Sequence, residues 1–334
     1  MASLIVIASL VGIVMLAASA LSNSSPTGTG TSASPASQPP RSYDTAEAAV
    51  EAFLNAVAQG DSVTAIALLT RAPGDRSLLT DEMLAASAAV APITDVTVTP
   101  DPAAPEHMAE VPVSYKVGEQ LVQTKVQARQ STGGSWVVYG TSTMRAPYGS
   151  DGLAITVNGI GVANPDQMEV FPGSYEIATT TRYYTFKGTT QTITTTDFSS
   201  DGFRETEITL NDEGLKVFRE AIVKDVDACL ASKKIDPGCG LGLESNPDRE
   251  LQPIEDTFKR ELSAEAKTAL KNLKPELDFE NPFSVSAGRI GSLKVTAKCE
   301  DTAAAKKVTP CEQNGARLGR PVVDFSTDPV TVRW

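Results

Sequence analysis

The chain is poor in the side chains on which most enzyme chemistry depends. Its 334 residues include one histidine, His107, which leaves little with which to build a Ser-His or Cys-His pair or a histidine metal site. It has no Cys-x-x-Cys pair and no Gly-x-Ser-x-Gly, Ser-x-x-Lys or Gly-Lys sequence, and so no phosphate-binding loop. We therefore expect a noncatalytic protein with no catalytic, cofactor-binding or metal-binding residues and no cofactor.

Basic residues are outnumbered as well. Lys and Arg total 29 against 41 Asp and Glu, which gives a net charge of −12 and a pI near 4.7. This balance argues against a nucleic-acid partner. Residues 1–43 contain one charged side chain, Arg41, so the rest of the chain carries 28 basic against 41 acidic groups. The hydrophobic fraction of 41% is ordinary for a globular protein, and the length fits about two domains.

Residues 4–21, LIVIASLVGIVMLAASAL, form an uncharged apolar run. As a helix this run is ~27 Å long, close to the ~30 Å of a bilayer core. It predicts contact with a membrane, either as a retained single-pass anchor or as a signal segment cleaved near Ala20; a buried core helix is a third interpretation. No cysteine lies at the cleavage site, which excludes a lipoprotein. No basic residue precedes the run, and a missing cytoplasmic leader would explain this.

Residues 22–43 are rich in Ser, Thr, Gly, Pro and Ala and offer little to bury. Such a composition cannot offset its ordering entropy, so we expect a disordered Ser/Thr/Pro linker. A tether behind an apolar segment holds the folded part of the chain away from the membrane. We therefore expect residues 22–334 outside the cytoplasm, in a protein that is either held in the cell membrane or secreted after cleavage.

Four cysteines, Cys229, Cys239, Cys299 and Cys311, lie downstream of the apolar segment. An even number in this position favours disulfides in an oxidising compartment. Of the three possible connectivities we expect the local one, Cys229–Cys239 with Cys299–Cys311, because each bridge then closes a short loop. Four buried free thiols in a cytoplasmic protein are the alternative.

Residues 44–147 show a helical pattern followed by an alternating one. Apolar residues recur at helical spacing between residues 46 and 57, Gly60 ends this helix, and further helices are expected before Pro92. Strands are then expected at 95–99, 109–117, 120–130 and 135–144. Helices followed by an antiparallel meander predict a domain with helices on one face of a sheet.

Two stretches of this domain resemble a known superfamily. Residues 46–61, AEAAVEAFLNAVAQGD, are similar to the opening helix of the nuclear-transport-factor-2-like (cystatin-like) superfamily, and residues 133–138, GGSWVV, resemble its last strand. The resemblance implies a cone-shaped α+β fold that hosts enzymes, ligand pockets and plain interaction modules. With the apolar segment, it implies a membrane-anchored extracytoplasmic protein of the Gram-positive, actinobacterial type, in a family of unknown function.

Residues 150–334 predict a second domain that is rich in strands. Residues 153–159 are a strand that runs into an Asn-Gly turn, and residues 170–177 contain a Pro-Gly turn within a strand pattern. Their order resembles the small β-sandwich repeats of bacterial surface proteins. A helix is expected from residue 211 to 231, and a shorter one at 264–273. The fold class expected for the whole chain is α+β: a membrane helix, a cone-shaped domain, and a β-rich α+β domain with two disulfides.

The leading hypothesis for function is a noncatalytic binding or scaffolding module at the bacterial cell envelope. Its partner would be a cell-wall polymer or another envelope protein. The alternative is a carrier or sensor of a small apolar or lipidic ligand in the cone of the first domain, and an enzyme of unknown type is third. An apolar lining with few charges around Trp136 and Tyr115 would favour the carrier, whereas a broad exposed groove on the second domain would favour wall binding.

Overall fold

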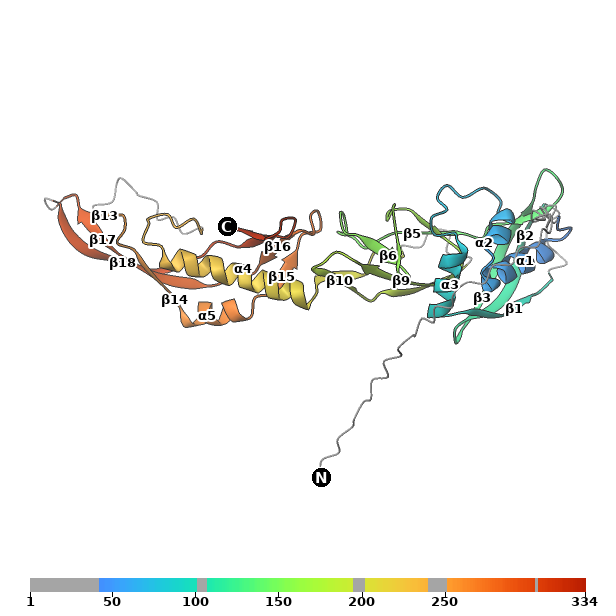
Figure 1. The fold of residues 1–334 in the computed structure, drawn as a ribbon, viewed down its shortest axis with the longest axis horizontal. Coiled ribbons are helices and arrows are strands. Elements are labelled where there is room, and N and C mark those ends of the chain that lie inside the picture. The colour runs from blue at the N-terminus through green and yellow to red at the C-terminus, as the bar shows by residue number, and fades with distance from the viewer. Residues whose placement is uncertain (1–41, 101–106, 195–201, 240–250, 304–305) are drawn as a thin grey trace, which may run out of the picture. The chain divides into compact units, whose positions relative to one another are not determined.

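A computed structural model describes residues 42–334 apart from 101–106, 195–201, 240–250 and 304–305 (Figure 1). Residues 42–334 form one compact unit. The predicted membrane segment, and almost all of the predicted linker, lie outside the described residues. Within the described ranges, no helix is both long and apolar enough to cross a membrane.

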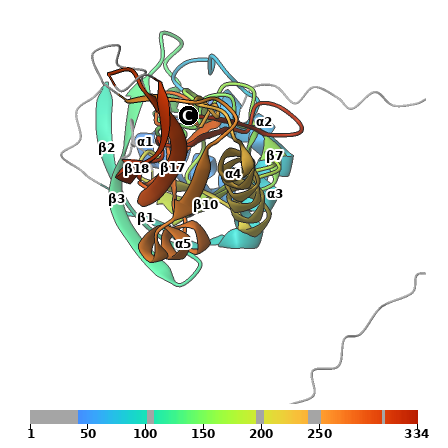
Figure 2. The ribbon, with the colours of Figure 1, turned by 90° about the vertical axis from the view of Figure 1, so that its left-hand side faces the viewer.

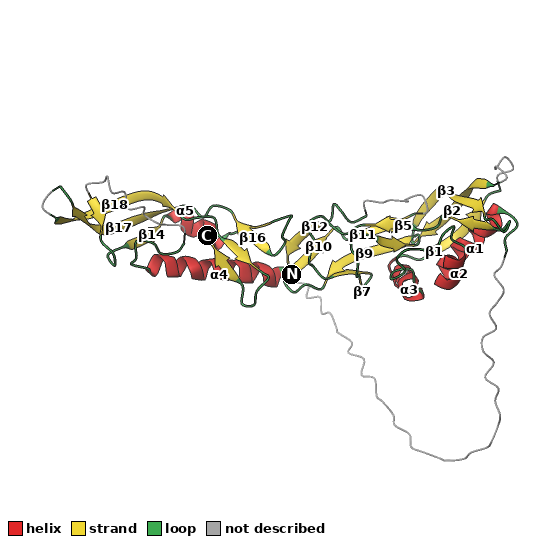
Figure 3. Ribbon diagram, turned by 90° about the horizontal axis from the view of Figure 1, so that it is seen from above, coloured by secondary structure: helices red, strands yellow, loops and turns green. Residues whose placement is uncertain are grey.

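The fold is mixed but rich in strands, which corrects the expected fold class. Strands hold 38% and helices 22% of the described residues, which contain five helices (Figure 3). The expected α+β class with a cone-shaped domain is therefore wrong for the described part of the chain, and none of the five helices described there is the expected membrane helix. One reason is that several short strands, such as β14 (Lys259–Leu262, KREL), are too polar and too short to show an apolar alternation. Their backbone groups pair all the same, because ladder hydrogen bonds do not depend on side-chain polarity.

Three helices open the described chain: α1 (Ala46–Gln59), α2 (Ser62–Ala67) and α3 (Asp81–Val90). Each begins at a side chain that accepts a hydrogen bond from a free amide of the first turn, as Thr45 does from the Ala48 amide at 3.2 Å. Asp61 and Thr80 cap the other two helices in the same way. Gly60 ends α1 in the left-handed conformation that glycine adopts without strain, as the sequence predicts.

The next element is a four-stranded antiparallel sheet with strands in the order β1-β2-β3-β4: β1 (Ile93–Val98), β2 (Met108–Val117), β3 (Gln120–Gln130) and β4 (Trp136–Val138). Helix α1 packs against all four strands, and Figure 2 shows the long β2–β3 pair curving past it. Phe53 of α1 and Tyr115 of β2 are fully buried between helix and sheet. Of the four strands, β2 supplies the largest number of side chains to this core, through its alternating residues.

The middle part of the chain forms three small antiparallel sheets, one of β5 and β8, one of β10 and β12, and one in the order β11-β9-β6-β7. Their strands are β5 (Ser142–Met144), β6 (Ile155–Val157), β7 (Ile160–Gly161), β8 (Met168–Val170), β9 (Gly173–Thr179), β10 (Tyr184–Lys187), β11 (Thr190–Ile193) and β12 (Glu207–Leu210). The turn at Asn158-Gly159 joins β6 to β7, at the Asn-Gly turn that the sequence predicts.

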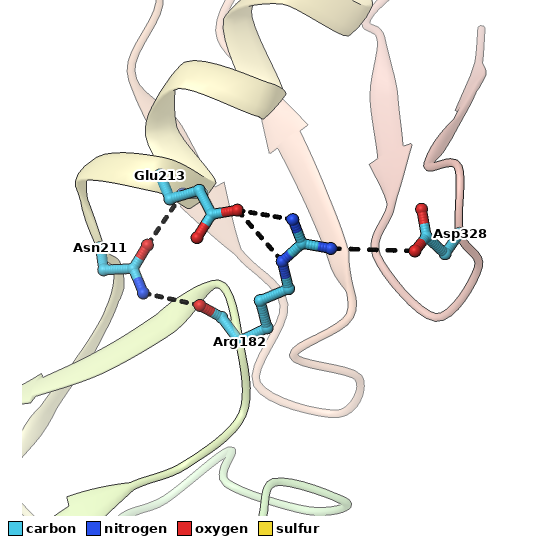
Figure 4. Close-up of polar contacts among 5 residues, drawn as sticks. Arg182, Asn211, Glu213 and Asp328 are labelled. Carbon is cyan, nitrogen blue, oxygen red and sulfur yellow. Dashed lines mark hydrogen bonds and ion pairs between the residues drawn. The ribbon is translucent and has the colours of Figure 1, made fainter.

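Helix α4 (Asp212–Ala231) is fixed to the turn before β10 by a small polar network (Figure 4). Asn211 caps the helix, and its side-chain amide donates to the carbonyl of Arg182 at 2.8 Å. The guanidinium of Arg182 forms an ion pair with Glu213 at 2.7 Å and reaches Asp328 at 3.8 Å. These exposed contacts therefore join the turn, the first turn of α4 and the C-terminal segment.

The C-terminal part contains two four-stranded sheets and helix α5 (Ala264–Lys271). In one, β17 (Ser292–Asp301) pairs along one side with β18 (Lys307–Arg317) and along the other with β13 (Leu251–Pro253) and β14. The other has the order β15-β16-β19-β20, from β15 (Pro275–Leu277), β16 (Ser284–Ala287), β19 (Val322–Asp324) and β20 (Thr331–Arg333). Among the described strands, β18 pairs with β17 alone.

The structure contains two disulfides, Cys229–Cys239 and Cys299–Cys311, in the local pairing that the sequence favours. The Cα atoms are 6.0 Å apart in the first bridge and 5.8 Å apart in the second. The first bridge is buried where α4 ends, and the second joins β17 to β18. Two disulfides and no described free cysteine indicate an oxidising compartment.

Contacts cross the predicted boundary between residues 147 and 150. Phe171 belongs to the core of the first sheet, and Met83 of α3 belongs to the core of the later strands. Ser87 of α3 accepts a hydrogen bond from the amide of Ser174 at 2.9 Å, and a Cβ at Gly173 would lie 2.4 Å from the same hydroxyl oxygen. The division into domains at 44–147 and 150–334 stays a prediction, but the two sides are closely packed.

Candidate functional site

The segment after β5, residues 145–151, is held tightly by backbone hydrogen bonds. The Arg145 carbonyl accepts from the Phe203 amide at 3.1 Å, and the Ala146 amide donates to the Pro165 carbonyl at 2.9 Å. The buried Ser150 hydroxyl donates to the carbonyl of Pro147 at 2.7 Å. The predicted boundary between the two domains falls in this segment. In the structure it is a turn whose backbone is anchored by these hydrogen bonds.

Two aromatic side chains are exposed at this turn. Tyr148 is 57% exposed and Phe279, in the loop between β15 and β16, is 78% exposed. The two loops meet at Gly149, where a Cβ would lie 3.1 Å from the Phe279 carbonyl oxygen. The Arg204 guanidinium lies 3.8 Å from the centre of the Tyr148 ring, close enough for a cation–π contact that orients the ring.

The loop that carries Phe279 is anchored by contacts with β10. Tyr184 of β10 donates its hydroxyl to the Pro282 carbonyl at 2.9 Å, and its ring meets that of Phe283 edge to face. Burial raises the pKa of the Tyr184 hydroxyl, with a smaller effect from Asp324, so this group stays protonated as a donor. The exposed Phe279 ring therefore projects from a supported loop.

The two aromatic residues and six polar residues line a pocket of about 450 Å³. The polar residues comprise two cations, two carboxylates and two carboxamides: Arg145, Arg204, Asp151, Asp166, Asn164 and Gln167. Their formal charges cancel, and together they offer both donors and acceptors. The pocket thus combines flat apolar surfaces with an electrically balanced set of hydrogen-bonding groups.

A second pocket of about 420 Å³ adjoins the first, and the two share Asn164 and Gln167. Its remaining lining comes from the loop between α2 and α3 and from β5 and β8: Arg71, Ala72, Gly74, Asp75, Thr143 and Glu169. We call the two adjoining pockets together the aromatic groove. Each of the two pockets is in the size range of pockets that bind small ligands.

The residues that the sequence pointed to lie elsewhere. Tyr115 is fully buried and Trp136 is 7% exposed, both in the core between α1 and the first sheet. His107 is exposed beside β2, where its ring nitrogen lies 3.0 Å from Gln130 Oε1. None of these three residues lines the aromatic groove. In the described part of the chain, no three His, Cys, Asp or Glu side chains gather as a metal site would require.

Sequence reasoning missed the aromatic side chains of the groove. Tyr148 lies in Pro147-Tyr148-Gly149, and Phe279 lies between Asp278 and Glu280. The available signal was an aromatic residue placed inside a turn, where no core is at hand to bury it. That signal marks each residue separately, whereas their proximity depends on how two loops 130 residues apart pack together.

Comparison of the chain with protein-family models, with curated proteins and with solved structures finds no match. The aromatic groove and its chemistry are therefore the basis on which a function can be assigned.

Proposed function

We propose that this protein is a noncatalytic binding module of the bacterial cell envelope, and that it holds an uncharged glycan chain in the aromatic groove. The observation that carries the proposal is the pair of exposed rings, Tyr148 and Phe279, beside a charge-balanced set of polar side chains. Sugar rings have apolar C–H faces that stack on aromatic rings, and hydroxyl rims that exchange hydrogen bonds with amides, carboxylates and guanidinium groups. The groove offers aromatic rings to the C–H faces and polar side chains to the hydroxyl groups.

The place of action is inferred from the sequence and the disulfides. Two bridges suit an oxidising compartment, and residues 4–21 would either anchor the chain in the cell membrane as a single span or direct its secretion with cleavage near Ala20. In both cases residues 22–334 lie outside the cytoplasm, where envelope polysaccharide is accessible.

The proposal is tested by retention of the full-length protein on purified, insoluble envelope polysaccharide. Replacement of both aromatic side chains in Tyr148→Ala/Phe279→Ala should lower retention by at least tenfold and leave folding intact, because both side chains are exposed. Leu121→Ala is the matched control, since Leu121 is a similarly exposed apolar residue on β3. Retention of the double variant at the wild-type level would overturn the proposal.

The alternative is a carrier or sensor of a small apolar or lipidic ligand in the first domain. A ligand in this domain would need a cavity beside Tyr115 and Trp136. Both side chains are instead packed into the core. Mass spectrometry of the purified protein distinguishes the two functions. Lipid that copurifies in equal molar amount would favour the carrier, and its absence together with glycan retention would favour the binding module.

A further inference from the structure

A larger pocket, of about 1010 Å³, lies between the β17–β18 sheet, the β15–β16 sheet and α5. Three arginines line it from three loops or strand ends. Arg289 comes after β16, Arg317 is the last residue of β18, and Arg320 lies just before β19. The remaining lining comprises two acids, four small residues and one leucine: Glu265, Glu276, Gly288, Gly291, Ser292, Gly319 and Leu318. We call this the arginine pocket.

Gly291 belongs to a loop that lines the arginine pocket and packs closely against α5. It has a φ of +119°, and a Cβ there would lie 3.1 Å from the Cβ of Ala266. This backbone conformation and this close approach both require glycine. The loop that leads from Arg289 to β17 is therefore fixed against the helix.

One of the three arginines is already paired. Arg320 donates to the Ala287 carbonyl at 3.1 Å through Nε and forms an ion pair with Glu276. The other acid, Glu265, lies in the first turn of α5, where hydrogen bonds from its own amide and from the Ser263 hydroxyl lower its pKa. Both carboxylates thus have partners other than Arg289 and Arg317.

Arg289 and Arg317 are exposed, and neither side chain makes a hydrogen bond or an ion pair within the described part of the chain. Three arginines and two glutamates give the lining of the arginine pocket a formal charge of +1, in a chain whose net charge is −12. A pocket with a positive charge and two unpaired guanidinium groups attracts a small anion. The aromatic groove differs, because the charges of its cations and carboxylates around Tyr148 and Phe279 cancel.

We propose that the arginine pocket binds a phosphate group, with Arg289 and Arg317 as its ligands. Each guanidinium presents a planar fork of N–H donors that matches two oxygens of an oxyanion. A phosphate is tetrahedral, and each of its unesterified oxygens accepts more than one hydrogen bond, so two arginines on separate segments can bind it from two sides. A planar carboxylate is satisfied by one fork. The assignment does not rest on the glycan function proposed above.

Glycerol 3-phosphate is the soluble probe, titrated into the full-length protein and followed by calorimetry. The variant Arg289→Gln/Arg317→Gln should weaken binding at least tenfold, because glutamine keeps polar length but removes both charges. The matched control is Lys306→Gln/Lys307→Gln, which removes the same amount of charge. These two exposed lysines lie at the end of the β17–β18 hairpin opposite to Arg317. This control should bind the probe as the wild type does.

Vesicles distinguish a free phosphate from a lipid headgroup. Cosedimentation with phosphatidylglycerol vesicles, but not with phosphatidylcholine vesicles, that depends on Arg289 and Arg317 would identify the lipid as the source. Binding of the soluble probe alone would identify a phosphate in solution or on a polymer. The assignment fails if the double variant and the lysine control behave alike with both probes, or if acetate competes as well as inorganic phosphate at equal concentration.

Discussion

The first sheet and the β17–β18 hairpin are both long antiparallel ladders, but different forces hold them. In β2 every second side chain is buried, and α1 covers the sheet with an apolar face. In β18 one residue of eleven, Ala316, is buried. The hairpin has the Cys299–Cys311 bridge, which has no counterpart in the first sheet. A covalent link thus supports the ladder that has little core of its own.

The largest loss of stability is expected from truncation of the core between α1 and the first sheet. Phe53→Ala removes a fully buried ring that packs 6.0 Å from the ring of Phe171, so unfolding free energy should fall by about 3–5 kcal/mol. Urea denaturation measures this change. Leu121→Ala, an exposed position on the same sheet, should change stability by less than about 0.5 kcal/mol. A loss below about 1 kcal/mol for Phe53→Ala would remove the basis of the contrast.

The second prediction concerns the bridge. Cys299→Ala/Cys311→Ala opens the link between diagonal neighbours on β17 and β18 and should cost about 3 kcal/mol, because the unfolded chain gains freedom. Hydrogen exchange should rise in β17 and β18 while β2 and β3 stay protected. Equal loss of protection in both ladders would show that the hairpin is not a separately supported unit.

Substitution of glycine tests the difference between the packed first sheet and the sparsely packed β18. A Cβ at Gly140 would lie 2.3 Å from the Phe53 ring, so Gly140→Ala should overpack the first core and cost about 1–3 kcal/mol. In β18, Gly315 has a φ of +76° and open space around it, so Gly315→Ala should cost about 1–2 kcal/mol from backbone strain alone. Thermal unfolding compares the two. A second substitution, Phe53→Leu, should relieve Gly140→Ala and leave Gly315→Ala unchanged.

The smallest expected effect is at acidic pH. Hydrogen bonds from the hydroxyl and amide of Ser62 lower the pKa of Asp81, and hydrogen bonds from Lys294 and Asn314 lower that of Glu312 on β18. A carboxylate with a lowered pKa stabilises the fold above its unfolded pKa, about 3.9 for Asp and 4.3 for Glu, and this contribution is lost as the pH falls through the folded pKa.

Asp81→Asn and Glu312→Gln should each flatten the loss of stability below about pH 4. Only the Glu312 effect should shrink markedly in 1 M salt, because Lys294 forms an ion pair with it at 2.7 Å. Denaturation curves at several pH values and two salt concentrations measure both effects. An acid limb unchanged by either variant would contradict the assignment.

Local chemistry was readable from the sequence wherever one residue acts on its neighbours. Thr45 and Gly60 bound α1 as their capping preferences predict, and the alternation of β2 predicts its buried face. The spacing of Cys299 and Cys311 likewise favours the bridge that the structure contains. In each case the determining contact spans about a dozen residues or fewer.

Features that depend on distant segments could not be predicted in this way. Strand β14 pairs with β17 although its sequence, KREL, does not alternate, and the fold class was wrong partly because such strands were invisible. Packing between loops, which no local pattern encodes, places Tyr148 and Phe279 in one pocket. It likewise places Arg289 and Arg317 in the lining of the arginine pocket. Aromatic residues are usually expected to be buried, so the exposure of Tyr148 and Phe279 becomes known only from the folded structure.

The second side of β18 pairs with no other described strand, and this bears on self-association. A long strand that pairs on one side only is a template on which another copy can extend the sheet. Pro310 removes an N–H group from this strand, and the register shifts between Leu293 and Val295 of its partner. Charged and polar side chains at most exposed positions add repulsion and hydration. The hairpin with little core of its own thus also lacks the regular, apolar edge on which edge-to-edge aggregation depends.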